Sequence, residues 1–324
     1  MKTAALIFVV LFCVSCDTSD TGDGNQTESR DYRQDMRDFV IGISQKGKAG
    51  NDPFFTIPQN GIELVSNDDD DNLNGNAAYL AAIDGNGQED LLYGYDNDDT
   101  ATPASVTSYL KRFLDLSKSA GKKILVTDYC STPSKMADSY QKNAVAGFTS
   151  FAATERSLNV IPQAPPHNEN NAVVSDLSQV KNFIFLINPE NYSSKQAFIN
   201  AVTATNYDLV IIDLFANEQM LTASDVSQLK NKANGGKRLV ICYMSIGEAE
   251  DYRYYWNSSW NADKPDWIAA ENPDWPGNYK VKYWNSDWQG IIYRNNDSYL
   301  DKITTAGFDG VYLDIIDAFE YFEE

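Results

Sequence analysis

Residues 307–319, GFDGVYLDIIDAF, form a strand-like apolar run that is interrupted by an acid at Asp314. A second run of this kind, YDLVIIDLF at residues 207–215, reaches an acid at Asp213. A buried parallel strand tolerates an acid only near its C-terminal end, where a barrel opens to solvent. Because an unpaired buried carboxylate costs several kcal/mol, Asp314 is the first candidate for a catalytic group.

Short apolar runs alternate with amphipathic or polar segments along the rest of the chain. This alternation predicts a parallel sheet, and eight units predict a closed (βα)8 TIM barrel over residues 35–324. An open, doubly wound sheet is the alternative, but the chain lacks the glycine-rich phosphate loop that usually accompanies it. The predicted strands are 54–58, 79–84, 123–129, 147–152, 182–188, 208–214, 238–245 and 307–315, and the predicted helices are 35–46, 103–120, 134–146, 194–205, 223–233 and 297–306.

Composition and charge narrow the class of partner. The chain has 324 residues, of which 43% are hydrophobic and 12% aromatic, enough for a sizeable core. A net charge of −20 argues against nucleic acid and anionic membranes and favours neutral or cationic partners. Cys130 and Cys242 follow apolar runs, which favours buried free thiols over a disulfide. His167 is the single histidine, so neither a Ser-His-Asp triad nor a His-based metal centre is expected, and no cofactor is expected.

The N-terminal residues predict export. Lys2 followed by the apolar residues 4–14 is typical of a signal peptide and is too short to span a bilayer comfortably. CVSC at residues 13–16 resembles a bacterial lipoprotein cleavage box, so residues 1–15 are a predicted lipoprotein signal and Cys16 is the predicted lipidation site. Residues 16–34 are the predicted flexible tether. The expected location is the bacterial outer membrane or cell surface, with membrane contact through the lipid alone; an ordinary signal peptide is the alternative.

Acidic and aromatic residues gather where several predicted strands end. The seventh strand runs into YMSIGEAEDYRYYW at residues 243–256, and Asp84 or Glu89 follows the second. The C-terminal ends of barrel strands carry catalytic groups. A mouth of carboxylates without histidine suits glycoside hydrolysis, and it would also suit a hard cation such as calcium. The residues expected at this mouth are Asn60, Glu89, Asp128, Asp213, Tyr243, Ser245, Glu248, Glu250, Arg253, Asp314 and Asp317.

Two segments depart from the strand–helix rhythm. All 6 Trp residues lie within residues 248–296, after the seventh predicted strand. Their rings could stack on sugar faces or form a small satellite core over the barrel mouth, and for any single Trp the second interpretation is favoured. Residues 153–179, rich in Pro and Asn, are interpreted as an inserted connector.

Three motifs resemble a known enzyme family. YMSIGEAEDYRYYW (243–256), WPGNYKVKYW (275–284) and GFDGVYLDIIDAFEYF (307–322) resemble the glycoside hydrolase family 114 superfamily, especially its bacterial, extracellular branch once labelled cysteinyl-tRNA-synthetase-like. The resemblance implies a (βα)8 barrel and endo-α-1,4-polygalactosaminidase activity. The segments 36–64, 81–94 and 121–130 resemble the family's C-terminal half, so the chain is interpreted as a circular permutant in which strand 54–58 pairs with strand 307–315.

The resemblance also implies roles for the acids. Asp314 matches the family's strand-end aspartate, as an ionised nucleophile with Arg253 nearby, and Glu89 is the acid/base with a raised pKa. The other mouth residues are assigned to substrate binding. The expected function is an extracellular, monomeric glycoside hydrolase that cleaves a polysaccharide, with an α-1,4-linked galactosamine-containing polymer as the candidate. A non-catalytic carbohydrate-binding surface lipoprotein is the alternative, whereas charge, export signal and the missing phosphate loop argue against a synthetase-like nucleotide enzyme.

Overall fold

The computed structural model describes residues 30–50, 53–69 and 73–323. The chain divides into residues 1–31 and a compact unit from Tyr32 to Glu324, and the fold described below is that of the second unit. Its first helix, α1 (Tyr32–Gly50), begins at Tyr32, before the expected boundary at Asp35. Cys16 and the expected signal peptide lie outside the described residues. Among the residues searched, no helix is both long enough and apolar enough to cross a membrane.

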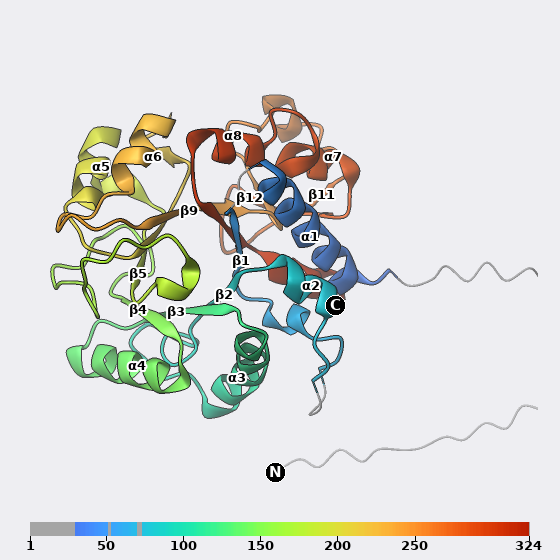
Figure 1. Cartoon of the computed structure of the whole chain (residues 1–324). Coiled ribbons are helices and arrows are strands. Elements are labelled where there is room, and N and C mark those ends of the chain that lie inside the picture. Colours follow the sequence, from blue (N-terminus) through green and yellow to red (C-terminus); the bar gives the residue numbers. More distant parts are fainter. Residues whose placement is uncertain (1–29, 51–52, 70–72, 324) are drawn as a thin grey trace, which may run out of the picture. The chain divides into compact units, whose positions relative to one another are not determined.

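Parallel strands form two sheets, which confirms the predicted α/β fold with a parallel sheet (Figure 1). One sheet has five strands and the other has three, and a single parallel bridge between Gln59 and Gly87 connects them. β1 pairs with β13 in parallel, with Ile57 opposite Tyr312, so the predicted pairing of these strands is confirmed. The five-stranded order is β1 (Phe55–Pro58), β13 (Gly310–Asp314), β9 (Leu239–Ser245), β6 (Leu209–Ile212), β5 (Phe183–Phe185), and the three-stranded order is β2 (Gly85–Glu89), β3 (Lys123–Tyr129), β4 (Thr149–Ala153).

The second strand was placed wrongly from the sequence. Residues 79–84 fall mostly in helix α2 (Ala77–Ala82), whose N-cap Asn76 accepts a hydrogen bond from the backbone N–H of Tyr79. The strand is instead the glycine-containing GNGQE of β2. Glycine is a poor strand former by propensity. It is required here because a Cβ on Gly87 would lie 1.9 Å from the Tyr312 hydroxyl, so close packing overrides propensity.

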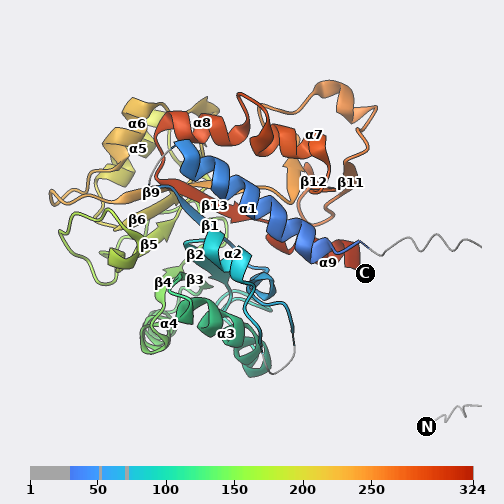
Figure 2. The same cartoon turned by 45° about the vertical axis from the view of Figure 1, so that its right-hand side comes forward.

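Helices cover the outer faces of the sheets (Figures 1 and 2). α3 (Ala104–Ser119) and α4 (Pro133–Ala146) flank the three-stranded sheet, while α5 (Lys195–Thr203) and α6 (Ala223–Leu229) flank β5 and β6. α1 and α8 (Tyr299–Ala306) lie side by side next to β1 and β13. Gly147 and Gly307 end α4 and α8 with positive φ angles of 76° and 84°. The helices therefore leave the strand ends free to carry the polar residues described below.

The tryptophan-rich segment forms a small antiparallel sheet beside β9. Trp288 and Trp267 are buried, and the Trp288 indole donates a hydrogen bond to the Ile246 carbonyl, whereas Trp275 is 62% exposed. Trp267 and Trp288 belong to the main hydrophobic core of the unit, and Trp256, Trp260 and Trp284 pack against it, so these rings do not form a separate satellite core. The segment comprises β10 (Glu248–Glu250), β11 (Ile268–Glu271), β12 (Asn278–Val281) and α7 (Ser286–Gln289). The remaining elements within the described residues are β7 (Phe215–Ala216), β8 (Gln219–Met220), α9 (Phe319–Glu323), the single turns Ile62–Val65, Leu177–Gln179, Pro189–Asn191, Ser258–Asn261 and Ile316–Ala318, and a π-helical turn at Gly290–Arg294.

The first and last helices of the unit touch one another. Arg33 of α1 forms a salt bridge of 3.1 Å with Glu323 of α9. The rings of Tyr32 and Phe322 stack with centroids 5.6 Å apart. Figure 2 shows α1 reaching α9 at the same end of the unit. The two ends of the compact unit are therefore neighbours in space, as is common for domain termini.

Candidate active site

Asp314 ends β13 and is held by its neighbours on both sides. Its Oδ2 accepts a hydrogen bond of 2.5 Å from the Tyr243 hydroxyl on β9, and its Oδ1 accepts one of 2.8 Å from the backbone N–H of Ile315. Ile315 has φ 59° and ψ 37°, a left-handed conformation that β-branched residues rarely adopt. Such strain persists where the surrounding structure enforces it, often at functional sites. Gly247 permits this conformation, because a Cβ on Gly247 would lie 1.9 Å from the Ile315 carbonyl oxygen.

Glu89 ends β2 and is held by donors from two other strands. Its Oε2 accepts a hydrogen bond of 3.1 Å from the Asn60 side-chain amide, which follows β1. Its Oε1 accepts a short hydrogen bond from the hydroxyl of Tyr129 at the end of β3. Asn60 also accepts from the backbone N–H of Glu89 at 3.0 Å, and its φ of 57° suits an Asn. The carboxylate is thus fixed in one orientation.

Asp314 and Glu89 are close enough to interact electrostatically. Burial and the nearby charge of Glu89 raise the pKa of Asp314 to about 8. Asp317, one turn further along, is in the same cluster, and burial together with the charge of Glu320 raises its pKa to about 7. The sequence-based expectation of an ionised Asp314 is therefore wrong at neutral pH, because burial and a neighbouring acid both favour the protonated form.

Arg253 does not pair with Asp314, contrary to expectation. Its guanidinium lies 2.6 Å from Asp213 and also forms a short ion pair with Glu250. The Arg253 and Asp213 side chains are each 9% exposed, and that of Glu250 is 4% exposed. Asp213 also accepts a hydrogen bond from the Phe215 N–H, and its pKa is raised by burial. The group is a buried ion network between β6 and β10. It lies beside the Asp314 site, because Tyr243 interacts with both Asp314 and Glu250: burial and these two acids raise the pKa of Tyr243 well above its ordinary value.

Glu248 and Ser245 lie at the junction of β9 with the small sheet. The Glu248 side chain is 2% exposed and lies 3.6 Å from the Lys280 amine. It accepts hydrogen bonds from Asn272 at 2.8 Å and Asn278 at 3.4 Å. The Ser245 hydroxyl donates to the Glu248 carbonyl at 3.1 Å. These side chains hold the small sheet against the end of β9.

Two expected mouth acids lie elsewhere. Strand residues alternate between faces, so Asp128 points away from its neighbour Tyr129, which contacts Glu89. Its buried carboxylate is saturated by Ser139 and Asn143 of α4 and by the backbone N–H groups of residues 92 and 93. Asp84 precedes β2 and pairs with Lys48 at 2.9 Å. The structure therefore gives Asp128 and Asp84 structural contacts outside the cluster of Asp314 and Glu89.

Sequence reasoning missed two residues of the site, Tyr129 and Arg156. The sequence predicts Tyr129 at the end of a strand, and the alternation of side chains along β3 directs its hydroxyl to Glu89. Arg156 lies in the segment that was interpreted as a connector. Its guanidinium carbon is 3.8 Å from the centre of the Tyr129 ring, and it pairs with Asp90 at 3.0 Å. The sequence offered one signal for Arg156: it is a lone Arg three residues after the end of a strand, in a chain rich in acids.

The described residues contain no group of three or more His, Cys, Asp or Glu arranged to hold a metal ion. Cys130 and Cys242 are free and buried, so the expectation of two free thiols is confirmed. His167 stacks on Tyr140 with centroids 4.2 Å apart, and partial burial lowers its pKa.

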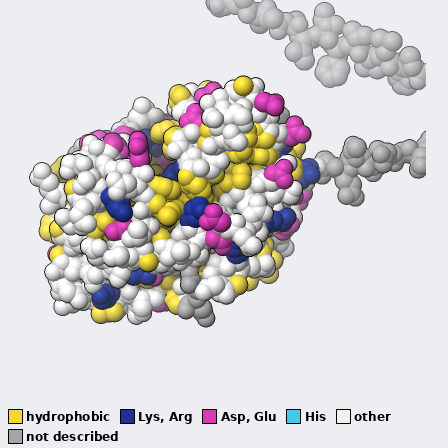
Figure 3. Space-filling model, turned by 90° about the horizontal axis from the view of Figure 1, so that it is seen from above, with side chains coloured by type: hydrophobic (Ala, Val, Ile, Leu, Met, Phe, Trp, Pro, Cys, Tyr) yellow, Lys and Arg dark blue, Asp and Glu magenta, His cyan; other side chains and the backbone are white. Residues whose placement is uncertain are grey.

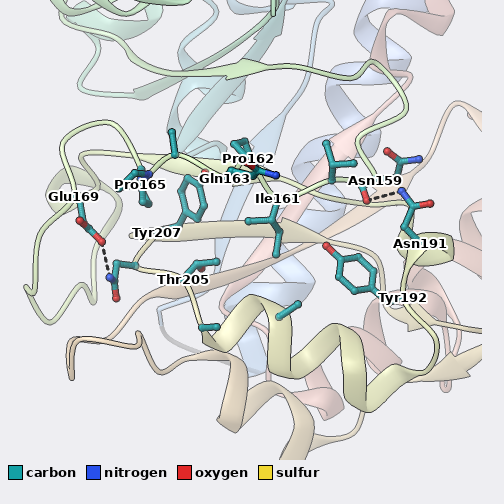
Figure 4. A pocket seen from close by; sticks show the side chains of 16 residues that line it. Asn159, Ile161, Pro162, Gln163, Pro165, Glu169, Asn191, Tyr192, Thr205 and Tyr207 are labelled. Carbon is teal, nitrogen blue, oxygen red and sulfur yellow. Dashed lines mark hydrogen bonds between the residues drawn. The ribbon is translucent and has the colours of Figure 1, made fainter.

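Two cavities lie outside the carboxylate cluster. The larger, of about 640 Å³, is lined by connector residues 159–166 and by Tyr192 and Tyr207 (Figure 4). The smaller, of about 460 Å³, lies between α3 and α4. Neither includes Asp314 or Glu89. Figure 3 shows one face of the molecule on which hydrophobic side chains gather in a hollowed band, with charged side chains at its border.

Comparisons with known proteins match part of the chain. An uncharacterized protein of Methanocaldococcus jannaschii is 42% identical over 133 residues, which are 41% of this chain and 37% of the relative. Uncharacterized proteins of Thermotoga maritima and Deinococcus radiodurans are 37% and 40% identical over 38% and 39% of this chain, and over 36% and 38% of their own lengths. The matched residues thus span little more than a third of these relatives. Residues 184–324 match the family model of glycoside-hydrolase family GH114.

Proposed function

We propose that the protein is a glycoside hydrolase that cleaves a polysaccharide with Asp314 and Glu89. The observation that carries the proposal is a pair of interacting carboxyl groups at the ends of two parallel strands, each held by a tyrosine hydroxyl from a neighbouring strand. Glycosidic bonds are cleaved by two such carboxyl groups in different protonation states. The match of residues 184–324 to GH114, which contains Asp314, supports the same reaction class.

The protonation states favour Asp314 as the proton donor. With a pKa of about 8, Asp314 holds a proton at neutral pH and can protonate the glycosidic oxygen as the bond breaks. Glu89 accepts hydrogen bonds from Asn60 and Tyr129, which is the arrangement of an ionised carboxylate. Glu89 then attacks the anomeric carbon or deprotonates the attacking water. These roles are the reverse of those that the family resemblance implied.

Asp314→Asn and Glu89→Gln test both the pair and its roles. On a polysaccharide, each variant should lose about 10²–10⁴-fold in kcat. On an aryl glycoside, whose nitrophenolate leaves without protonation, Asp314→Asn should retain most of the rate of bond cleavage, measured as nitrophenolate release in the first turnover, and Glu89→Gln should not. Asp297→Asn, at a site that is 82% exposed, is the matched control and should act like the wild type.

The opposite aryl-glycoside pattern would return the nucleophile role to Asp314. Near-normal turnover of both variants on the polysaccharide would move the chemistry to another pair of acids. The wild type is first screened against a polysaccharide library that includes α-1,4-linked galactosamine polymers. A wild type that binds a glycan without cleaving it would favour the alternative, a carbohydrate-binding module.

A cationic amino-sugar polymer is the preferred substrate. The chain carries a net charge of −20, and the carboxyl groups of Glu89 and Asp317 lie close to one another at the strand ends. Such a site attracts positive charge and excludes anionic glycans. Cleavage of the same polymer after N-acetylation, which removes its charge, should have a higher KM; an unchanged KM would reject the electrostatic preference.

The proposal includes a closed barrel in circularly permuted order. Pairing of the first and last strands is expected of any closed barrel, so it does not by itself indicate permutation. Support comes from the family match, which begins at residue 184, and from the contacts of α1 with α9, which place the unit's two ends together. Between β4 and β5, where the original termini would lie, the described residues form no strand ladder.

A chain restored to the family order tests the permutation. It joins residue 323 to residue 32 through a short linker and opens the connector at residues 163–164. Cooperative unfolding at a denaturant midpoint near that of the wild type is expected, because the connector is opened at exposed residues and the joined ends are neighbours in space. Failure to unfold cooperatively would contradict the permutation.

Export and lipid anchoring at Cys16 stay a prediction, because these residues lie outside the described part. Labelled fatty acid should enter the wild type and not Cys16→Ser; equal labelling would reject the anchor.

A further inference from the structure

The Arg156 guanidinium packs against the ring face of Tyr129, whose hydroxyl donates a hydrogen bond to Glu89. Its guanidinium carbon lies 3.8 Å from the centre of the Tyr129 ring, the closest arginine–ring contact described in this chain. Tyr129 is 2% exposed, and its hydroxyl donates to Glu89. The ring is therefore held between a guanidinium on its face and a carboxylate at its hydroxyl end. At this distance a cation–π contact fixes both groups in orientation.

The guanidinium is itself fixed by several acceptors. It forms two hydrogen bonds with Asp90, of 3.0 and 3.3 Å, and one of 2.6 Å with Asp98. Its Nη2 also donates to the Gly94 carbonyl at 2.9 Å. Asp90 directly follows Glu89 in the chain. Arg156 thus holds Glu89 from two directions, through the Tyr129 ring and through the backbone of the next residue.

The turn from Asp90 to Gly94 is shaped to receive this arginine. Gly94 has a φ of 119°, and a Cβ there would lie 2.0 Å from Asp90 Oδ1 and 2.8 Å from Arg156 Nη2. Asp90 also has a positive φ, of 57°. An exposed ion pair that only joins two loops needs neither a glycine nor a left-handed aspartate. The backbone is instead arranged around the guanidinium.

We infer that Arg156 is a positioning residue, which acts through Tyr129 to hold the Glu89 carboxylate in its reactive orientation. The inference rests on the proposed role of Glu89. It gives the segment after β4 a function in the active site, in addition to connecting two parts of the chain. The charge of Arg156 opposes the rise in the pKa of the Tyr129 phenol that burial and Glu89 cause, which keeps the hydroxyl a good donor.

A double-mutant cycle in the folded, full chain tests the inference without requiring catalysis. The readout is the side-chain carboxyl ¹³C signal of Glu89, assigned by its absence in Glu89→Gln. Arg156→Gln and Tyr129→Phe should shift this signal by the same amount, and the double variant should shift it no further, because both remove one hydrogen bond. Arg156→Lys should shift the Glu89 signal less than Arg156→Gln does, since lysine keeps the charge but not the planar stack.

Arg294→Gln is the matched control. Arg294 also lies over a tyrosine, at 5.5 Å from the Tyr293 ring centre, but away from the carboxylates. It should leave the Glu89 signal unchanged. No shift in Arg156→Gln, or additive shifts in the double variant, would overturn the inference even if the enzyme is active.

Activity then separates this inference from the proposed function. On a cleaved glycan, Arg156→Gln and Tyr129→Phe should each lower kcat about tenfold with KM nearly unchanged, and should displace the same limb of the pH profile. If the wild type cleaves no glycan but Arg156→Gln and Tyr129→Phe shift the Glu89 signal equally, the positioning of Glu89 is upheld and the glycosidase function is rejected. An unchanged pH profile in an active Arg156→Gln would overturn the inference.

Discussion

The two candidate catalytic groups are held in parallel ways by unrelated sequence segments. Asp314 accepts from Tyr243 and Glu89 from Tyr129, and in each case an arginine paired with two acids lies nearby. Arg253, near Tyr243, belongs to the part of the chain that matches GH114; Arg156, against Tyr129, lies outside that match. The parallel indicates that the geometry of a carboxylate, a phenol and an arginine can be built from different segments.

The two arginines differ in burial. The Arg253 side chain is 9% exposed and its partners are equally buried, whereas that of Arg156 is 38% exposed. Arg156 stacks directly on Tyr129, but Arg253 stacks on Tyr252 at 5.5 Å instead. We therefore expect Arg253 to contribute mainly to folding and Arg156 mainly to the orientation of the site.

Arg253→Ala should show the largest effect on stability. It leaves Asp213 and Glu250 buried without their cation, which costs about 3–5 kcal/mol. Arg156→Ala removes a partly exposed ion pair, which solvent screens, and should cost about 1 kcal/mol or less. Urea unfolding at pH 7 measures both. Equal losses for the two variants would reject the division between a structural and a positioning arginine.

Sequence patterns were sufficient for most of the fold. Apolar runs such as LVICYMS at Leu239–Ser245 are buried along their whole length and can be recognised as strands from composition alone. β2 was missed because its sequence, GNGQE, reflects the close approach of Tyr312 rather than strand propensity. Such a contact joins residues far apart in the chain and leaves no local signal.

The site could be predicted only in part, and for a similar reason. Asp314 could be found because an acid in an apolar run is rare, and Glu89 by its resemblance to a family motif. Which face a strand residue occupies depends on register, so Asp128 was assigned to the mouth although Tyr129 is the residue that faces Glu89. The protonation of Asp314 depends on burial and on a neighbour brought by folding, which the sequence does not encode locally.

The raised pKa of Asp314 also predicts how stability depends on pH. In the unfolded chain the carboxyl titrates near 3.8, and in the folded protein near 8. Between these values the folded state binds the extra proton, so the contribution of Asp314 is fully present below about pH 4 and is lost as pH rises to about 8. Asp314→Asn, which resembles the protonated acid, should therefore have a urea midpoint similar to that of the wild type at about pH 3 and a higher one at about pH 9.

The expected gain at pH 9 is about 1–3 kcal/mol, smaller than the loss in Arg253→Ala, because Asp314 is only partly buried. The Glu89 charge is one cause of the raised pKa, so the gain should shrink in a Glu89→Gln background. A gain that is equal in both backgrounds would mean that the two carboxyl groups do not interact. The similarity between the surroundings of Asp314 and those of Glu89 would then be one of geometry alone. A gain of the same size at about pH 3 would assign the stabilisation to packing of the amide. Only a gain that requires both high pH and an intact Glu89 fits a pair in which the charge of Glu89 makes Asp314 hold its proton.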